Sequence, residues 1–166
     1  MLSLWLQQER HENVLATGLL LLPMSLTVGA GSLASGRLTA RFGPRPPMIA
    51  GLTLAAAGTA LLSTAGAGTP TTAILAGSIL LGLVSLAMPA MTAAVVGAAG
   101  PEHAGVASGT LNAARQSGGA LGVALLGSLL GHPPDLRVPL LAATAGYLIA
   151  VALAAATVRG TARRLP

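Results

Sequence analysis

The chain has no cysteine and no lysine, and charged residues of any kind make up only 8% of its 166 residues. The absence of cysteine excludes disulfides, thiolate metal sites and cysteine nucleophiles. A typical soluble domain carries about 25% charged residues. A soluble domain of this length could not cover its surface with so few charges. Aromatic residues reach only 2%, so the aromatic belts found at many membrane interfaces are nearly absent.

Apolar residues, by contrast, make up 53% of the chain, and the mean hydropathy is +0.77. These values indicate a membrane protein whose main solvent and partner is the lipid bilayer. The net charge of +5 comes entirely from arginine, which favours a GC-rich bacterial genome. The nine arginines are scattered and form no basic stripe with interleaved aromatics, so no nucleic-acid partner is expected.

Five stretches are long and apolar enough to cross a membrane, which takes about 20 residues in a helix. They are Val14–Ser35, Met48–Ala67, Ala73–Ala99, Gly105–Leu130 and Val138–Val158. We therefore predict an all-α, polytopic bundle of five transmembrane helices over residues 14–158. Residues 1–13 resemble the stub of a truncated helix followed by an external loop, and residues 159–166 form a tail.

Arginine placement predicts the orientation. The segment after the first span holds Arg37, Arg41 and Arg45, and the tail holds three more arginines. With five spans these segments lie on one side, which the positive-inside rule assigns to the cytoplasm. Only Arg10 and Arg137 lie on the other side, although the Gly100–Ala104 turn, also predicted to be cytoplasmic, has no arginine. We expect a multi-pass inner-membrane protein with an external N-terminus and a cytoplasmic C-terminus.

The arginine-rich segment between the first two spans is the most specific motif. Its pattern is Gly36-x-Leu38-x-x-Arg41-x-Gly43-x-Arg45. It resembles the cytoplasmic loop motif of the major facilitator superfamily, although Ala40 occupies the motif's aspartate position. That departure matches the degraded second copy of the motif. The resemblance implies a tight glycine turn whose arginines cap helix C-termini. An ordinary positive-inside loop without a special role is the alternative.

A second stretch, Gly105–Gly122, is similar to the start of the penultimate helix in the drug:proton antiporter branch, especially its fourteen-span members. The resemblance runs over nearly the whole chain. It implies a partial C-terminal half of a major facilitator fold, whose substrate site lies between two halves. The N-terminal half would be a missing partner, and the parent could have twelve or fourteen spans.

Arg115 is the only charge inside a predicted span. Ser108, Asn112 and Arg115 recur at helical spacing and share one face, with Gln116 beside them. One interpretation is a polar stripe that lines a cavity or forms a gate. The other, which we favour, is that Arg115 bonds to a neighbouring helix and fixes the packing of the bundle.

Glycine and proline inside the spans suggest packing contacts and kinks. Pro23 and Pro89 should distort their helices. Gly118 and Gly122 form an i,i+4 pair that permits close helix approach, and Gly119 lies on the polar face. Plain membrane packing is the alternative for most of these positions.

No span contains aspartate, glutamate or histidine, and no cluster has metal-ligand spacing, so neither catalysis nor a metal or other cofactor is expected. The resemblance implies proton-coupled efflux of a small molecule by a larger transporter. Proton coupling needs a titratable group in the membrane, which would have to lie outside this chain. The alternative is a non-transporting membrane protein, either a truncated gene product or a small subunit packed against a partner.

Overall fold

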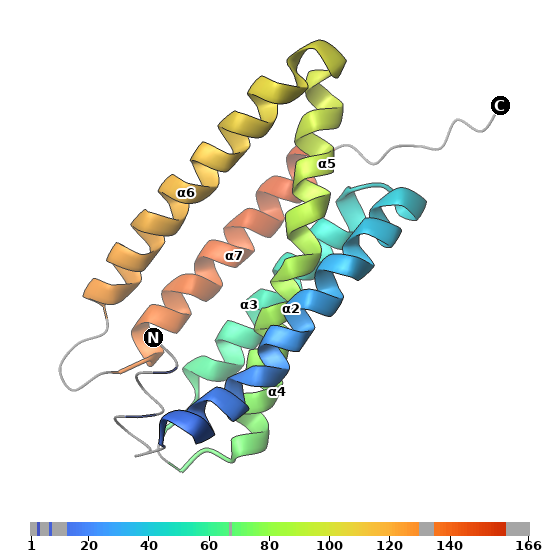
Figure 1. Ribbon diagram of the computed structural model, residues 1–166. Helices are drawn as coiled ribbons and strands as arrows, with labels where there is room; N and C mark the ends of the chain where they lie inside the picture. The colour runs from blue at the N-terminus through green and yellow to red at the C-terminus, as the bar shows by residue number, and fades with distance from the viewer. Residues whose placement is uncertain (1–2, 4–6, 8–12, 67, 130–134, 159–166) are drawn as a thin grey trace.

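The computed structural model describes residues 3, 7, 13–66, 68–129 and 135–158. Within these ranges the elements are all helical: α2 (Val14–Phe42), α3 (Arg45–Ser63), α4 (Thr71–Gly82), η1 (Leu83–Leu86), α5 (Ala87–Ala99), η2 (Pro101–His103), α6 (Ala104–Ser128) and α7 (Arg137–Thr157). Figure 1 shows long helices, with short turns joining α2 to α3 and α5 to α6. The predicted all-α bundle is therefore confirmed. The predicted stub and tail fall almost wholly outside the described residues.

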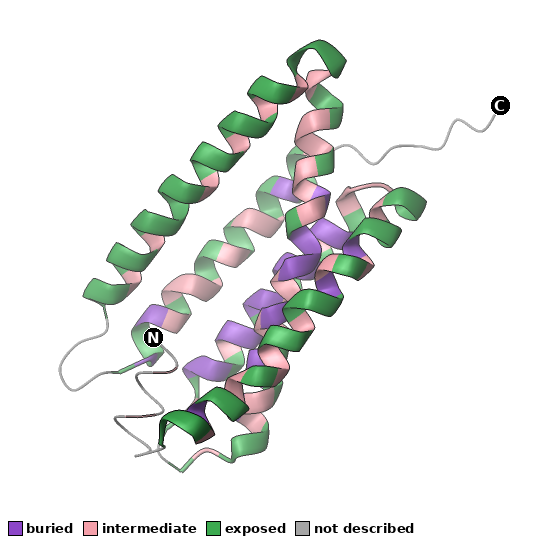
Figure 2. Ribbon diagram, in the orientation of Figure 1, coloured by how far each residue is buried: buried purple, intermediate pink, exposed green. Residues whose placement is uncertain are grey.

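Helix α3 is the centre of the bundle and packs against α2, α4, α5 and α7. Ten of its nineteen residues are buried, among them Met48, Leu52 and Leu62. Met48 and Leu52 meet alanines of α5 and α7, and Leu62 meets Ile74 of α4. Buried residues accordingly gather around α3 in Figure 2, whereas the outer helices are mostly exposed.

Glycine allows α3 and its neighbours to approach one another closely. A Cβ atom on Gly58 would lie 2.6 Å from the backbone nitrogen of Leu81 and 2.7 Å from the carbonyl oxygen of Gly77. A Cβ on Gly51 would lie 2.8 Å from the nitrogen of Ala87. The helix backbones are therefore in direct contact, as small residues permit in membrane bundles.

Four helical segments are long and apolar enough to span a membrane: α2, α3, the combined Thr71–Ala99 and α7, among the residues that the structure describes. Helix α6 is not among them, because its mean hydropathy is too low. Its 25 residues would extend about 37 Å at 1.5 Å per residue, so length is not the reason. Its polar residues lower the hydropathy, and its crossing of the membrane stays a prediction.

The predicted break at Gly36–Pro47 is wrong over most of its length. Helix α2 continues to Phe42, α3 begins at Arg45, and only Gly43 and Pro44 connect them. Gly43 adopts a φ of 81°, which ends α2 without requiring a longer loop. Pro44–Pro47 then lies at the start of α3, where missing backbone N–H groups cost little.

Candidate functional site

The third span is one helical segment, Thr71–Ala99, but its α-helical hydrogen bonding is interrupted beside Pro89, and we call this interruption the break. Helix α4 gives way to the 3-10 segment η1, and α5 begins at Ala87. Proline has no N–H to donate to the carbonyl four residues earlier, so it disturbs the α-helical hydrogen bonds at this point. Pro23 contrasts with it, because α2 is one helix from Val14 to Phe42.

A side chain from α2 bonds to the backbone at this break. The hydroxyl Oγ of Ser35 donates a hydrogen bond of 2.6 Å to the carbonyl oxygen of Leu86, the last residue of η1. Ser35 is fully buried. A buried carbonyl that accepts a well-formed bond avoids the cost of desolvation, so Ser35 stabilises the break from one side.

Arg115 of α6 bonds to the same region from the other side. Its Nη2 donates to the carbonyl oxygen of Met88 at 2.8 Å and to Oγ1 of Thr92 at 3.0 Å. The Thr92 hydroxyl also donates to the Met88 carbonyl, at 3.2 Å. Nε of Arg115 is buried and has no partner among the described residues. Arg115 therefore links α6 to α5, and its role in fixing the packing of the bundle stays a prediction.

The rest of the predicted polar stripe lies open. Ser108, Asn112 and Gln116 are all exposed, and α6 has no buried residue. A Cβ on Gly118, Gly119 or Gly122 would meet nothing within 4 Å. The structure thus brings Arg115 into contact with α5 but leaves its predicted companions without a facing helix from the described residues. Their roles as cavity, gate or packing residues stay predictions.

The residues of the arginine-rich motif are spread over a helix end, a turn and a helix start. Gly36, Leu38 and Arg41 lie in the last two turns of α2, and the guanidinium of Arg41 lies 5.2 Å from the ring centroid of Phe42. Arg45 begins α3, and its Nη2 donates a 2.9 Å bond to the carbonyl oxygen of Ala155 in the last turn of α7. A cation at a helix C-terminus interacts favourably with the helix dipole.

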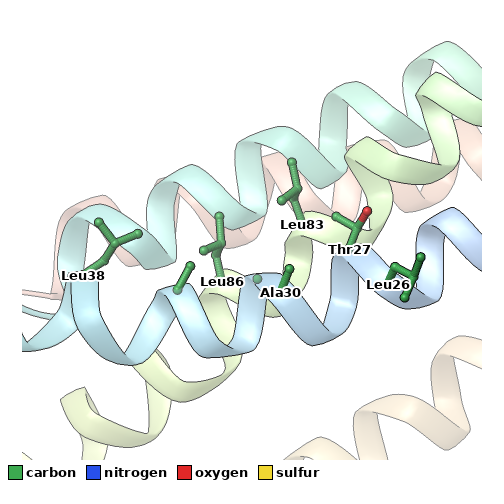
Figure 3. Close-up of a pocket in the computed structure, with 8 residues that line it drawn as sticks. Leu26, Thr27, Ala30, Leu38, Leu83 and Leu86 are labelled. Atoms are coloured by element: carbon green, nitrogen blue, oxygen red, sulfur yellow. The ribbon is translucent and has the colours of Figure 1, made fainter.

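An open groove of about 520 Å³ runs along α2 beside the break. Figure 3 shows its lining of leucine, alanine and threonine side chains from α2 and η1. The lining residues are Leu26, Thr27, Ala30, Gly31, Ala34, Leu38, Leu83 and Leu86. No charged residue lines it, so it suits an apolar chain or an apolar helix face. Sequence reasoning missed this groove, because no sequence pattern marks which faces of α2 and η1 meet.

Sequence reasoning also missed the hydroxyl contacts between helices. Oγ1 of Thr59 in α3 and Oγ1 of Thr144 in α7 are 2.8 Å apart. Thr59 and Ser35 look like ordinary small residues in apolar runs. Their hydrogen bonds can be identified only when the position of the facing helix is known. Within the described ranges, no group of three histidine, aspartate or glutamate side chains could hold a metal ion.

The comparisons with known proteins identify the family. The family model described as Major Facilitator Superfamily matches residues 1–165. The chain is 38% identical over 139 residues to the methylenomycin A resistance protein of Streptomyces coelicolor, covering 81% of this chain and 29% of that protein. It is 36% identical over 168 residues to the puromycin resistance protein of Streptomyces alboniger, covering 92% and 33% respectively.

A third relative is the multidrug resistance protein Stp of Mycobacterium tuberculosis, 35% identical over 127 residues, covering 76% of this chain and 24% of that protein. The chain therefore spans a third or less of the length of these curated relatives. No solved structure matches it significantly. The helical bundle, its apolar helices and the family match agree: the chain is a multi-pass membrane protein that belongs to the major facilitator superfamily of transporters.

Proposed function

We propose that the chain is the C-terminal portion of a proton-coupled exporter of small molecules. The observation that carries this proposal is its alignment with resistance proteins. Between 76% and 92% of this chain aligns with 24% to 33% of three proteins named for resistance to antibiotics or drugs. The other part of such a transporter would supply the second wall of the substrate cavity.

Proton coupling would depend on groups outside the described helices. The described acids, Glu102 and Asp135, lie at the ends of the long helices and not within them. Because a proton carrier in a transporter is normally a titratable side chain inside the membrane, the rest of the protein would have to supply it. This chain would contribute the span that contains the 3-10 turn η1 and the contact of Arg115 with α5.

We also propose that the C-terminus is cytoplasmic. The bond from Arg45 to Ala155 brings the turn between α2 and α3 to the last turn of α7. In Figure 1 this turn and the end of α7 likewise lie toward the same end of the bundle. The arginines near this turn and those of the tail would then lie on one side, as the positive-inside rule requires.

A chimera tests the transport function. The matching segment of the Streptomyces alboniger puromycin resistance protein would be replaced by this chain and expressed in a puromycin-sensitive bacterium. We expect the chimera to restore resistance, and a protonophore to abolish the efflux. The chain expressed alone should give neither, because it lacks most of the cavity and every intramembrane acid.

The alternative of a non-transporting membrane protein predicts a different result. A chimera that reaches the membrane at the normal level and folds, yet gives no resistance, would contradict the proposed function. Efflux by the purified chain alone in proteoliposomes would contradict the claim that further helices are required.

A further inference from the structure

Arg115 carries a positive charge that the described chain does not neutralise. Both hydrogen bonds from its Nη2 end on uncharged oxygens, the Met88 carbonyl and the Thr92 hydroxyl. Nε is buried without a partner, and no bond joins Nη1 to the described residues. The α-helices α2 to α7 contain no aspartate or glutamate, and Glu102 lies in the 3-10 segment η2 before α6. An arginine near the middle of a membrane helix is normally paired, so this guanidinium still has the capacity to bind an anion.

The neighbouring surface of α6 is suited to another helix. Gly105, Gly109, Asn112 and Gln116 recur at spacings of four, three and four residues and therefore share one face. All four are exposed, and a Cβ on either glycine would meet nothing within 4 Å. Small residues allow close approach of a second helix, and amide side chains provide hydrogen bonds across it. Lipid tails could satisfy neither the amides nor the charge.

Charge also indicates which kind of helix could cover this face of α6. A second copy of this chain on the same face would bring one Arg115 toward another, and like charges repel. A helix that carries a carboxylate would neutralise the guanidinium with bonds that are stronger than those to neutral acceptors. Because the chain spans only 24% to 33% of the length of its relatives, such proteins contain ample sequence for further helices.

We propose that Arg115 forms an ion pair with an aspartate or glutamate on a transmembrane helix outside this chain, and that this helix packs along the Gly105–Gln116 face of α6. This proposal rests on the proposed function only in requiring further transmembrane helices. It does not require proton coupling or a particular substrate. Arg115 would then bind on two sides, to α5 through Nη2 and to the carboxylate through Nη1, because Nε is covered by this chain.

Association with a synthetic helix tests the proposal. The full chain would be placed in lipid nanodiscs with a dye on Ser128→Cys, which is a unique thiol because the chain has no cysteine. The probe would be a Leu-rich transmembrane peptide with one central aspartate and an acceptor dye. The matched peptide would carry asparagine, which forms hydrogen bonds but has no charge. We expect energy transfer to show at least tenfold tighter association of the aspartate peptide.

Substitutions then locate the contact. Arg115→Gln should reduce the affinity for the aspartate peptide to the affinity for the asparagine peptide. Arg115→Lys should retain part of the preference for the aspartate peptide. Gly109→Leu should block the close approach of the peptide to α6. Ala114→Leu, on the far side of α6, should not. Circular dichroism would verify that each variant is folded. Equal affinity for the two peptides, or a preference that survives in folded Arg115→Gln, would overturn the proposal.

The same assay detects a different occupant. Labelled copies of the chain alone would show energy transfer between themselves if a second copy covered this face. Such transfer, if Gly109→Leu abolished it, would also overturn the proposal. Because the assay measures association and not transport, its failure can be distinguished from failure of the chimera to export puromycin.

Discussion

Replacing Gly58 by alanine should force α3 and α4 apart. The new Cβ would lie 2.6 Å from the nitrogen of Leu81, whereas ordinary contacts begin near 3.4 Å. The shortfall is 3.4 − 2.6 = 0.8 Å. Both the nitrogen of Leu81 and the nearby carbonyl oxygen of Gly77 belong to the α4 backbone, so no side-chain rotation can relieve the clash.

Overpacking of this kind typically costs about 1–3 kcal/mol. Alanine also has a better helix propensity than glycine, by up to about 1 kcal/mol in water, which opposes the clash. We therefore expect Gly58→Ala to lower the free energy of unfolding by up to about 2 kcal/mol. Gly109→Ala is the matched control, because it carries the same propensity gain at a position where a Cβ meets nothing within 4 Å.

The measurement is reversible unfolding of the purified chain in mixed micelles, titrated with dodecyl sulfate and followed by far-ultraviolet circular dichroism. The helix-propensity gain cancels when the free energies of unfolding of the two alanine variants are subtracted. The difference that remains should equal the cost of the clash, about 1–3 kcal/mol. If Gly58→Ala unfolds at the same dodecyl sulfate concentration as Gly109→Ala, then α3 and α4 do not approach as closely as these distances require, and the reasoning is refuted.

Three further predictions use the same chain. Arg115→Leu removes the donor to the Met88 carbonyl and the Thr92 hydroxyl, so it should destabilise the bundle by about 1–3 kcal/mol; a higher melting temperature in detergent would instead mean that Arg115 faces lipid. A double-mutant cycle with Thr59→Val and Thr144→Val should give a coupling energy of about 0.6 kcal/mol, and zero coupling would count against their hydrogen bond. A reporter that is active only in the periplasm, fused after Pro166, should be inactive, and activity there would contradict a cytoplasmic C-terminus.

The existence of the helices follows from the sequence, but their ends do not. Long apolar runs are helical because the membrane leaves few other ways to satisfy the backbone. The start at Val14 is also marked locally, since the side chain of Asn13 accepts a 2.7 Å bond from the Ala16 nitrogen. The end of α2 was misplaced because arginine and glycine were interpreted as a loop. A helix tolerates both where it reaches the membrane surface, and it ends at Gly43, where φ is positive.

The functions of individual glycines cannot be inferred from their spacing. Gly118 and Gly122 show the i,i+4 pattern of a packing motif, yet a Cβ added to either would meet no atom of the described chain within 4 Å. A Cβ on Gly58 or Gly51 of α3, seven residues apart, would instead lie within 3 Å of the backbone of a neighbouring helix. The difference lies in which helix faces each glycine. That is a property of the fold, and spacing within one helix does not report it.

The polar side chains of α6 can also be understood only from the helix that faces them. A helix that is mostly exposed and carries arginine, asparagine and glutamine would be poorly solvated by lipid on that polar face. One of these groups, Arg115, already finds acceptors at Met88 and Thr92 of α5, next to Pro89. The acceptors are available because Thr92 is polar and because a carbonyl oxygen can accept a second bond beside its helical one. The charge of α6 and the oxygens of α5 next to Pro89 therefore form one local arrangement, in which the polar side chain of one helix binds to acceptors of the other.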